Sequence, residues 1–346
     1  MIVRRSGPIG LDIGSSWIKA AQHAGRTLRV HAFPRREPGA LTPAEAERIA
    51  AVLDRTGFEG PSVVIAAPPD AVLAAVFDAP AHDGPALLAA ARAEIARVHR
   101  VDPRRFELAA RRLPGAARPG GGNAAAFAVS HHAADTLLDP LEAAGLDARS
   151  ITLHADALVR AADDSKEGTD DAPRVIADLG ASACSIILRL QSTSVFERRC
   201  PDLGLDRLAR DAAAALAIDP AEVFKRLRDP DALNPAERRA VSLAPVLKDW
   251  TSRIASEIAV SLDYLTKRYR CPPAGRVTLT GGGACIPGLD RAIEPAARCP
   301  VVAFDHPTTP PINPAAPAPL FAAAIGLADP VVPAIVPINA PSKEAA

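Results

Sequence analysis

Four residues near the start of the chain, Asp12, Gly14, Ser15 and Ser16, are of types that bind phosphate groups in proteins. They lie between two short apolar runs, a pattern that predicts a β-hairpin with these residues at its turn. Glycine permits a tight turn, in which successive amides and serine hydroxyls can surround phosphate oxygens. Asp12 could orient water around Mg²⁺, and Lys19 either approaches the same phosphates or points into solvent. Taken alone, the motif is more often an ordinary β-turn.

The same scheme returns in the second half of the chain. Residues 174–190 contain an apolar run, then Asp178, Gly180, Ala181 and Ser182, then a second apolar run. Two such hairpins can face each other across a cleft and hold a phosphate chain from both sides. Two carboxylates at one site are unfavourable unless a cation lies between them, which indicates a metal–nucleotide complex.

A third group, Gly281, Gly282 and Gly283, lies between a predicted strand and the start of a helix within residues 276–288. A glycine turn lets the backbone approach a flat base or a ribose, and a helix N-terminus favours negative charge. A plain turn after a strand is the alternative explanation. Because all three groups occur along the chain in this order, the explanation that they are three unrelated turns is less favoured.

The composition excludes several classes of protein. The 346 residues include 40 Lys or Arg and 40 Asp or Glu, so no overall field draws the chain to nucleic acid or anionic lipid. No run of about 18 apolar residues and no signal-peptide pattern is present, so we expect a cytoplasmic protein without a membrane span. Five cysteines without a Cys-x-x-Cys pair predict reduced thiols, and eight histidines without metal-ligand spacing predict no tightly held metal.

The elements that would position these motifs alternate between strands and helices, which predicts an α/β fold. We expect a helix at 43–57 and a buried strand at 62–69, and a different module of strands and helices follows from residue 71. Within the module, a helix at 85–100 would have an inward face. That face consists of Leu88, Ala91, Ile95 and Val98.

The second half follows a similar plan, with a polar linker at 163–173 and a Pro-rich tail from residue 330 that we expect to be disordered. Helical segments at 202–242 are interrupted by prolines, and a longer amphipathic helix follows them. Its apolar stripe consists of Leu247, Trp250, Ile254, Ile258, Leu262 and Leu265.

Together the three motifs resemble the phosphate-1, phosphate-2 and adenosine motifs of the actin/hexokinase/Hsp70 ATPase superfamily. Finer features resemble the PilM branch, the actin-like proteins of type IV pilus assembly, over nearly the whole chain to residue 328. These features are GLDIGSSWIKA, VVIAAPPDAVLAAVFDAP, AGLDARSITLHADALVRA, SLDYLTKRY, RVTLTGGGACIPGLDRAI and FAAAIGLA.

The resemblance implies a two-lobed actin-like ATPase fold, a duplicated ribonuclease H-like fold with an inserted small α/β subdomain as in FtsA and PilM. ATP and Mg²⁺ would lie in the cleft, with Asp12 and Asp178 near Mg²⁺ through water and with Glu222 and Lys225 beside the adenosine. The implied boundaries are 1–68 and 148–172 for subdomain IA, 69–147 for the inserted subdomain IC, 173–201 and 271–328 for IIA, 202–270 for IIB, and 329–346 for a disordered tail.

In PilM-like proteins, IC and its parent subdomain IA form a groove for the N-terminal cytoplasmic peptide of PilN, a bitopic inner-membrane protein. The resemblance therefore implies a cytoplasmic scaffold of type IV pilus biogenesis, or of the related type II secretion platform, held at the inner membrane by this partner. The resemblance does not decide whether the protein forms a homo-oligomer.

The sequence departs from the family pattern at the second hairpin, where Ala181, Ser182 and Ala183 offer fewer hydroxyls than relatives have. Charge-assisted hydrogen bonds contribute about 1.5–3 kcal/mol each, so phosphate binding would be weaker. No residue that would position an attacking water is evident. His154 and Asp156 are candidates by position only, and Asp156 is better explained as a helix cap. We therefore expect slow or absent ATP hydrolysis.

Three other hypotheses stay open. A small-molecule kinase of the sugar-kinase type would need a carboxylate base, for which residues 69–147 show no clear Asn-x-Asp or Gly-x-Asp loop. A filament former like FtsA would need an amphipathic C-terminal helix, which the proline-rich tail disfavours. A degenerate, nucleotide-free adaptor is consistent with the few hydroxyls of the second hairpin.

Overall fold

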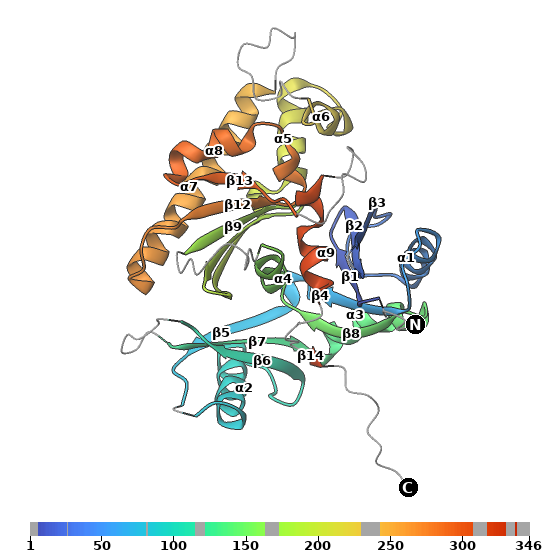
Figure 1. The fold of residues 1–346 in the computed structure, drawn as a ribbon, viewed down its shortest axis with the longest axis vertical. Helices are drawn as coiled ribbons and strands as arrows, with labels where there is room; N and C mark the ends of the chain where they lie inside the picture. Colours follow the sequence, from blue (N-terminus) through green and yellow to red (C-terminus); the bar gives the residue numbers. More distant parts are fainter. Residues whose placement is uncertain are drawn as a thin grey trace. The chain divides into compact units, whose positions relative to one another are not determined.

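The computed structural model describes residues 6–25, 27–80, 82–114, 122–162, 173–229, 243–306, 317–329 and 336–337 (Figure 1). The chain divides into two compact units, one of residues 1–13, 17–157 and 324–346 and the other of residues 14–16 and 158–323. Two of the boundaries fall inside helices, α4 (His154–Ala161) and α9 (Ala322–Leu327). The chain therefore passes from one unit to the other within these two helices.

The first unit contains a six-stranded sheet. Strands β1, β2 and β3 form an antiparallel meander, and β4 and β8 continue the sheet parallel to β1. A two-residue strand, β14, pairs antiparallel with the outer edge of β8. The strand order is β14-β8-β4-β1-β2-β3, with bounds Ile9–Ile13 (β1), Trp17–Ala24 (β2), Thr27–Pro34 (β3), Ser62–Ala66 (β4), Asp147–Thr152 (β8) and Val336–Pro337 (β14).

Helices α1 (Pro43–Arg55) and α3 (His131–Ala143) share an apolar core with this sheet. Each helix begins after a capping side chain: Thr42 accepts a hydrogen bond from the amide of Glu45 at 3.3 Å, and Ser130 accepts one from the amide of Ala133 at 3.2 Å. The largest fully buried side chains of this core are Ile9, Leu11, Ile18, Ile49, Ile65, Leu141 and Ile151.

A second, three-stranded sheet of the first unit lies within the inserted module. Its order is β5-β7-β6, and both outer strands run antiparallel to β7. Alternate side chains face opposite sides, so that Phe77 and Phe106 pack on helix α2 while Phe127 and Val129 pack toward the core of the larger sheet. The bounds are Val72–Phe77 (β5), Phe106–Arg112 (β6), Ala124–Ser130 (β7) and Pro85–His99 (α2), with a 3-10 turn at Pro69–Ala71 before β5.

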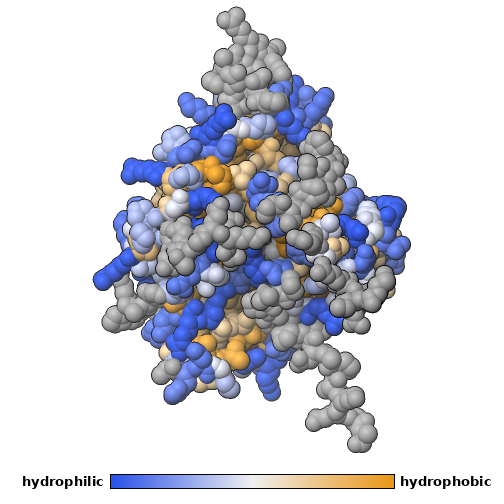
Figure 2. All heavy atoms as spheres, in the orientation of Figure 1, coloured by the Kyte–Doolittle hydropathy of each residue, from blue (hydrophilic) through white to orange (hydrophobic). Residues whose placement is uncertain are grey.

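The inward face of α2 differs from the predicted one. Leu87 is buried there with Ala91 and Ile95, whereas Leu88 is 45% and Val98 is 46% exposed. A sheet of three strands covers only a narrow stripe of a helix, and Leu88 lies about 100° around the helix axis from Leu87. Figure 2 shows apolar surface in the lower part of the view, where α2 lies in Figure 1.

The second unit repeats the strand topology of the first. Strands β9, β10 and β11 form an antiparallel meander, and β12 and β13 continue the sheet parallel to β9. This is the order of β1, β2, β3, β4 and β8, so the predicted duplicated α/β fold is confirmed. The order is β11-β10-β9-β12-β13, with bounds Arg174–Leu179 (β9), Cys184–Leu190 (β10), Thr193–Cys200 (β11), Arg276–Thr280 (β12) and Val301–Ala303 (β13).

Helix α7 (Ala244–Tyr269) covers this second sheet with the predicted apolar stripe, except that Leu262 is only half-buried. Two of its side chains reach backbone oxygens: Trp250 Nε1 donates to Leu203 O at 3.0 Å, and the Tyr269 hydroxyl donates to Val195 O at 3.2 Å. The other helices of the unit are α5 (Leu205–Leu216), α6 (Pro220–Arg226) and α8 (Leu289–Ala297), with 3-10 turns at Pro201–Leu203, Gly282–Cys285 (η3) and Ala318–Phe321.

Two predictions concern residues that lie mostly outside the described segments. The linker at 163–173 lies outside the described residues apart from Pro173, and so does most of the tail predicted to be disordered. Two residues of that tail form strand β14. All five cysteines are free thiols, and burial raises the pKa of the Cys184 thiol. Among the described helices, none combines the length and the apolar character that a bilayer span requires.

Candidate functional site

The first predicted hairpin is the β1–β2 pair, and Asp12 lies at the last but one residue of β1. Lys19 is its direct cross-strand partner, and Lys19 Nζ donates a hydrogen bond to Asp12 Oδ2 at 2.8 Å. The Lys19 side chain is 15% and the Asp12 side chain 11% exposed, so this ion pair is largely buried. Lys19 therefore does not point into solvent but neutralises the carboxylate at the end of the strand.

The turn of this hairpin is short. The last cross-strand pair is Ile13 with Ile18, and Gly14, Ser15 and Ser16 follow Ile13 as half-buried residues. The turn begins directly after the strand that carries Asp12, so the two serine hydroxyls are close in sequence to the carboxylate.

The second hairpin repeats this placement, because Asp178 is the last but one residue of β9. Its partner comes from the neighbouring parallel strand: Thr280 stands opposite Asp178, and its hydroxyl donates to Asp178 Oδ1 at 3.0 Å. Thr280 is fully buried. The sequence analysis did not select Thr280, although it directly precedes the triple glycine.

The turn after β9 is held by the first residues of α5. The amide of Leu205 donates to Gly180 O at 3.1 Å, and the amide of Asp206 donates to Ala181 O at 2.9 Å. In a trans peptide the carbonyl and the following amide point in opposite directions, so the amides of Ala181 and Ser182 point away from α5. Two successive amides on one side of a turn are a typical anion-binding arrangement.

A positive side chain lies beside this turn. The Arg199 guanidinium, from the end of β11, donates to the Ser182 hydroxyl oxygen at 3.4 Å. A guanidinium at this place would partly compensate for the missing hydroxyls of the second hairpin. Sequence reasoning missed Arg199 because only the β10–β11 pairing brings it to the turn.

The triple glycine packs directly on the second hairpin. Gly281 has a φ of +80°, and a Cβ there would lie 2.7 Å from Asp178 Oδ1. A Cβ on Gly283 would lie 2.6 Å from Leu179 Cβ. Side chains at either position would displace the end of β9, so the structure brings the predicted phosphate-2 and adenosine motifs together within the second unit.

Cys285 is the last residue of η3, two residues after the triple glycine, and its thiol is not readily ionised. Its Sγ lies 3.7 Å from Gly281 O, and burial raises the pKa of this thiol to about 11. The thiol is therefore protonated at neutral pH and does not serve as a nucleophile there.

Glu222 and Lys225, predicted beside the adenosine, lie on α6, which packs against α5. Arg226 Nε donates to Glu222 Oε1 at 3.0 Å, and this hydrogen bond lowers the pKa of Glu222. The Lys225 side chain is 81% exposed and lies 3.9 Å from the same carboxylate. Both residues thus form a surface charge cluster.

His154 and Asp156, the positional candidates for a water-orienting residue, lie in the first turn of α4. The Asp156 carboxylate receives two hydrogen bonds from Arg111 Nη1, at 2.8 and 2.7 Å, and the Arg111 guanidinium lies 4.8 Å from the centre of the Phe127 ring. This contact joins the inserted module to α4, so the geometry favours a structural role for Asp156.

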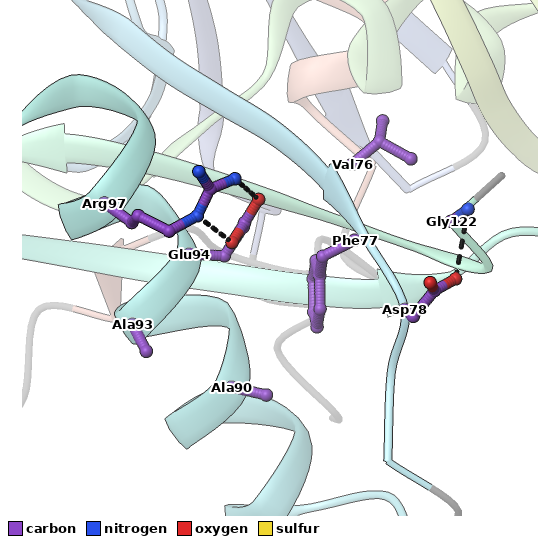
Figure 3. Close-up of a pocket in the computed structure, with 8 residues that line it drawn as sticks. All are labelled: Val76, Phe77, Asp78, Ala90, Ala93, Glu94, Arg97 and Gly122. Carbon is purple, nitrogen blue, oxygen red and sulfur yellow. Dashed lines mark hydrogen bonds and ion pairs between the residues drawn. The ribbon is translucent and has the colours of Figure 1, made fainter. Parts of the chain in front are cut away.

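An open groove of about 670 Å³ lies in the inserted module, between the end of β5 and α2 (Figure 3). Phe77 points toward α2 and Val76 to the other side of the sheet, while Glu94 and Arg97 form an ion pair at 2.7 Å on the helix. The Arg97 hydrogen bond lowers the pKa of Glu94. The lining residues are Val76, Phe77, Asp78, Ala90, Ala93, Glu94, Arg97 and Gly122, none of which belongs to the phosphate or glycine motifs.

The described segments contain no cluster of three or more His, Cys, Asp or Glu side chains that could hold a metal ion.

No protein-family model matches the chain, and no curated protein matches it. Solved structures do match. A PilM-PilN type IV pilus biogenesis complex matches with a TM-score of 0.75 and 19% identity, over 93% of this chain and 97% of the other. The ethanolamine utilization protein EutJ from Carboxydothermus hydrogenoformans matches with a TM-score of 0.55 and 13% identity, over 94% and 90% of the two chains.

MreB5 of Spiroplasma citri bound to AMPPNP matches with a TM-score of 0.54 and 12% identity, over 93% of this chain and 95% of the other. These similarities extend over both units and agree with the duplicated sheet topology. The chain therefore has an actin-like fold with a duplicated sheet topology and is structurally similar to the PilM-PilN complex structure.

Proposed function

We propose that this protein is an ATP-binding, actin-like scaffold of type IV pilus biogenesis, or of the related type II secretion platform, that binds the cytoplasmic N-terminal peptide of a PilN-like inner-membrane protein. The observation that supports the scaffold most is the similarity to the PilM-PilN complex over 93% of the chain. At 93% coverage, the match includes most of the inserted module as well as the two duplicated sheets.

The nucleotide part of the proposal is supported by the equivalence of the two hairpins. Asp12 and Asp178 occupy the same position in the two copies of the topology, each at the last but one residue of the first meander strand. The amides of Ala181 and Ser182 point to one side of their turn, and the triple glycine packs on the same strand end. Among the similar structures, MreB5 is described with ADP and with AMPPNP.

The residues fit a Mg²⁺–nucleotide better than a metal alone. Carboxylate oxygens and water are the ligands that Mg²⁺ prefers, and Mg²⁺ is usually bound by one or two carboxylates together with phosphate oxygens. Asp12 and Asp178 would hold it through water, while the hairpin turns and Gly281–Gly283 bind the phosphates and the adenosine. When bound, Mg²⁺ would neutralise phosphate charge.

Lys19 and Thr280 have supporting roles in this proposal. Each donates a hydrogen bond that fixes the carboxylate of its own hairpin, Lys19 to Asp12 and Thr280 to Asp178. Lys19 carries a positive charge and Thr280 is neutral, so the two donors differ in charge.

The nucleotide proposal is tested by titrating the protein with a fluorescent ATP analogue, with and without Mg²⁺. Asp12→Asn and Asp178→Asn keep the side-chain shape and remove the charge, and each is expected to weaken binding tenfold or more, about 1.4 kcal/mol. Asp263→Asn on the exposed side of α7, where the carboxylate is 76% exposed, is the matched control. If the folded wild type binds no nucleotide, the nucleotide-free adaptor takes the place of this proposal.

The partner part rests on the inserted module. Its three-stranded sheet packs toward the core of the six-stranded sheet, and Arg111 connects it to α4 through Asp156. We propose that the partner peptide binds where these two sheets of the first unit adjoin, between subdomains IA and IC. The partner then holds the protein at the inner membrane, and nucleotide binding alters the affinity for the peptide.

A further inference from the structure

The outer edge of β8 is occupied by a distant part of the same chain. Val336 stands opposite Ile151 and Pro337 opposite Ser150, in antiparallel register, so that β14 extends the six-stranded sheet by one short strand. The other edge of β8 is paired with β4. An edge strand presents unpaired amides and carbonyls, and a further strand can bind there through its backbone alone.

This edge adjoins the inserted module. Strand β14 contacts β6 as well as β8, so it lies where the six-stranded and the three-stranded sheets of the first unit approach each other (Figure 1). The Arg111–Asp156 ion pair joins β6 to α4 in the same unit. The short strand is therefore placed at the boundary of subdomains IA and IC, which is the place proposed above for the partner peptide.

We infer that the β8 edge is a strand-accepting site and that segment 336–337 is an internal competitor for the partner peptide, so that the protein is partly autoinhibited. The inference rests on the proposed function for the identity of the competing peptide. An incoming peptide adds as a strand to residues 150–151 and displaces β14.

The composition and the length of segment 336–337 favour a weakly paired strand that a partner peptide can displace. Proline has no amide hydrogen, so Pro337 can accept but not donate a backbone hydrogen bond to β8. Only two residue pairs are formed, so the segment binds only weakly as a separate molecule. Attachment to the same chain supplies an effective concentration in the millimolar range, which keeps the edge occupied until a peptide with more residue pairs arrives.

The test locks the segment in place in the full chain. Ser150→Cys with Pro337→Cys puts two thiols on directly opposed residues, at the spacing that a cross-strand disulfide requires. Oxidised glutathione forms the bond, and mass spectrometry identifies it. The labelled N-terminal peptide of the PilN-like protein is expected to bind the oxidised variant at least tenfold more weakly than the reduced one, with recovery after dithiothreitol. The single variant Ser150→Cys, oxidised in the same way, is the control.

A second variant loosens the segment. Val336→Gly with Pro337→Gly lowers the strand preference of the segment and is expected to raise the affinity for the partner peptide about threefold to tenfold, because the accessible fraction of the edge increases. A labelled peptide of residues 330–346 of this chain, added to the loosened variant, is expected to bind, and the same peptide is expected not to bind the cross-linked variant.

The outcomes separate this inference from the proposed function. Failure of the folded double-cysteine variant to cross-link, or equal affinity of its oxidised and reduced forms for both peptides, overturns the inference and leaves partner binding intact. If the PilN-like peptide binds no form of the protein while the 330–346 peptide distinguishes the loosened from the cross-linked variant, the strand-accepting edge stands and the partner assignment is wrong.

Discussion

At the level of single residues, the contact that most directly shapes the candidate phosphate site is the one between Thr280 and Asp178. Thr280→Val removes the hydroxyl that donates to Asp178 Oδ1 and keeps the shape of the side chain. Since Thr280 is fully buried, the substitution removes a buried hydrogen bond to a charged group, and we expect a loss of about 1–3 kcal/mol in the free energy of unfolding. Urea denaturation measures it, with Thr278→Val on the same strand as the control.

A second residue-level prediction concerns Glu45, which is buried at the start of α1. Arg48 donates to both oxygens of its carboxylate, at 2.6 and 3.1 Å, and these hydrogen bonds hold the pKa of Glu45 below its usual value of 4.5. A lowered pKa in the folded state contributes stability above pH 4.5, and this contribution disappears as the pH falls through the folded-state pKa.

Glu45→Gln is therefore expected to lower the free energy of unfolding at pH 7 by about 1.5–3 kcal/mol. The difference from the wild type should shrink below pH 4.5, where the Glu45 carboxylate becomes protonated. Denaturant titrations between pH 3 and pH 7 measure the difference, and exposed Glu47→Gln is the control. A pH-independent difference would show that the ion pair is not its cause.

At the level of elements, the two helices in which the chain changes unit approach each other very closely. A Cβ on Gly326 of α9 would lie 1.8 Å from the carbonyl oxygen of Ala157 on α4. No side-chain rotation can relieve a clash with backbone, so Gly326→Ala must separate the two helices. We expect a loss of 3 kcal/mol or more, roughly the upper end of overpacking effects, measured by thermal or urea unfolding.

Gly7→Ala is the matched control, because a Cβ on Gly7 would have its nearest neighbour at an ordinary 3.8 Å. This substitution is expected to change the free energy of unfolding by about 0.5 kcal/mol or less. Equal effects of the two substitutions would contradict the close packing of α4 and α9.

Local sequence patterns predicted the strands and helices that carry the motifs. They did not predict the side-chain contacts between residues far apart in the sequence. The β1–β2 and β9–β10 hairpins followed from apolar runs around Asp12 and Asp178. Thr280, Arg199 and Arg111 reach their partners only through strand pairing or packing between segments far apart in sequence. No local periodicity marks such residues.

The same limit explains the differences at α2 and β14. Periodicity predicted which side of α2 is apolar, but the width of the opposing sheet decided that Leu87 and not Leu88 is buried. Proline content predicted disorder for the tail. An edge strand tolerates a proline where a central strand does not, and Val336–Pro337 pairs at such an edge.

At the level of the whole molecule, the duplicated topology places equivalent carboxylates in both units, and a ligand bound by both motifs would stabilise the complete fold. A ligand present at 100 times its Kd stabilises the folded state by about 2.7 kcal/mol. We expect Mg²⁺–ATP to raise the Tm of the wild type by several degrees and that of Asp178→Asn by about half as much or less, because tenfold weaker binding leaves about 1.4 kcal/mol of stabilisation. An equal rise in both proteins would place the nucleotide elsewhere.

The measurement that tests the central claim most directly is calorimetric titration of the full chain with the N-terminal cytoplasmic peptide of the PilN-like protein, with and without Mg²⁺–ATP. A scaffold of this kind is expected to bind one peptide per chain with a micromolar Kd, and ATP should change that Kd. A folded protein that binds the peptide in neither condition would contradict the assignment. Binding that ATP leaves unchanged would retain the scaffold and remove the nucleotide switch.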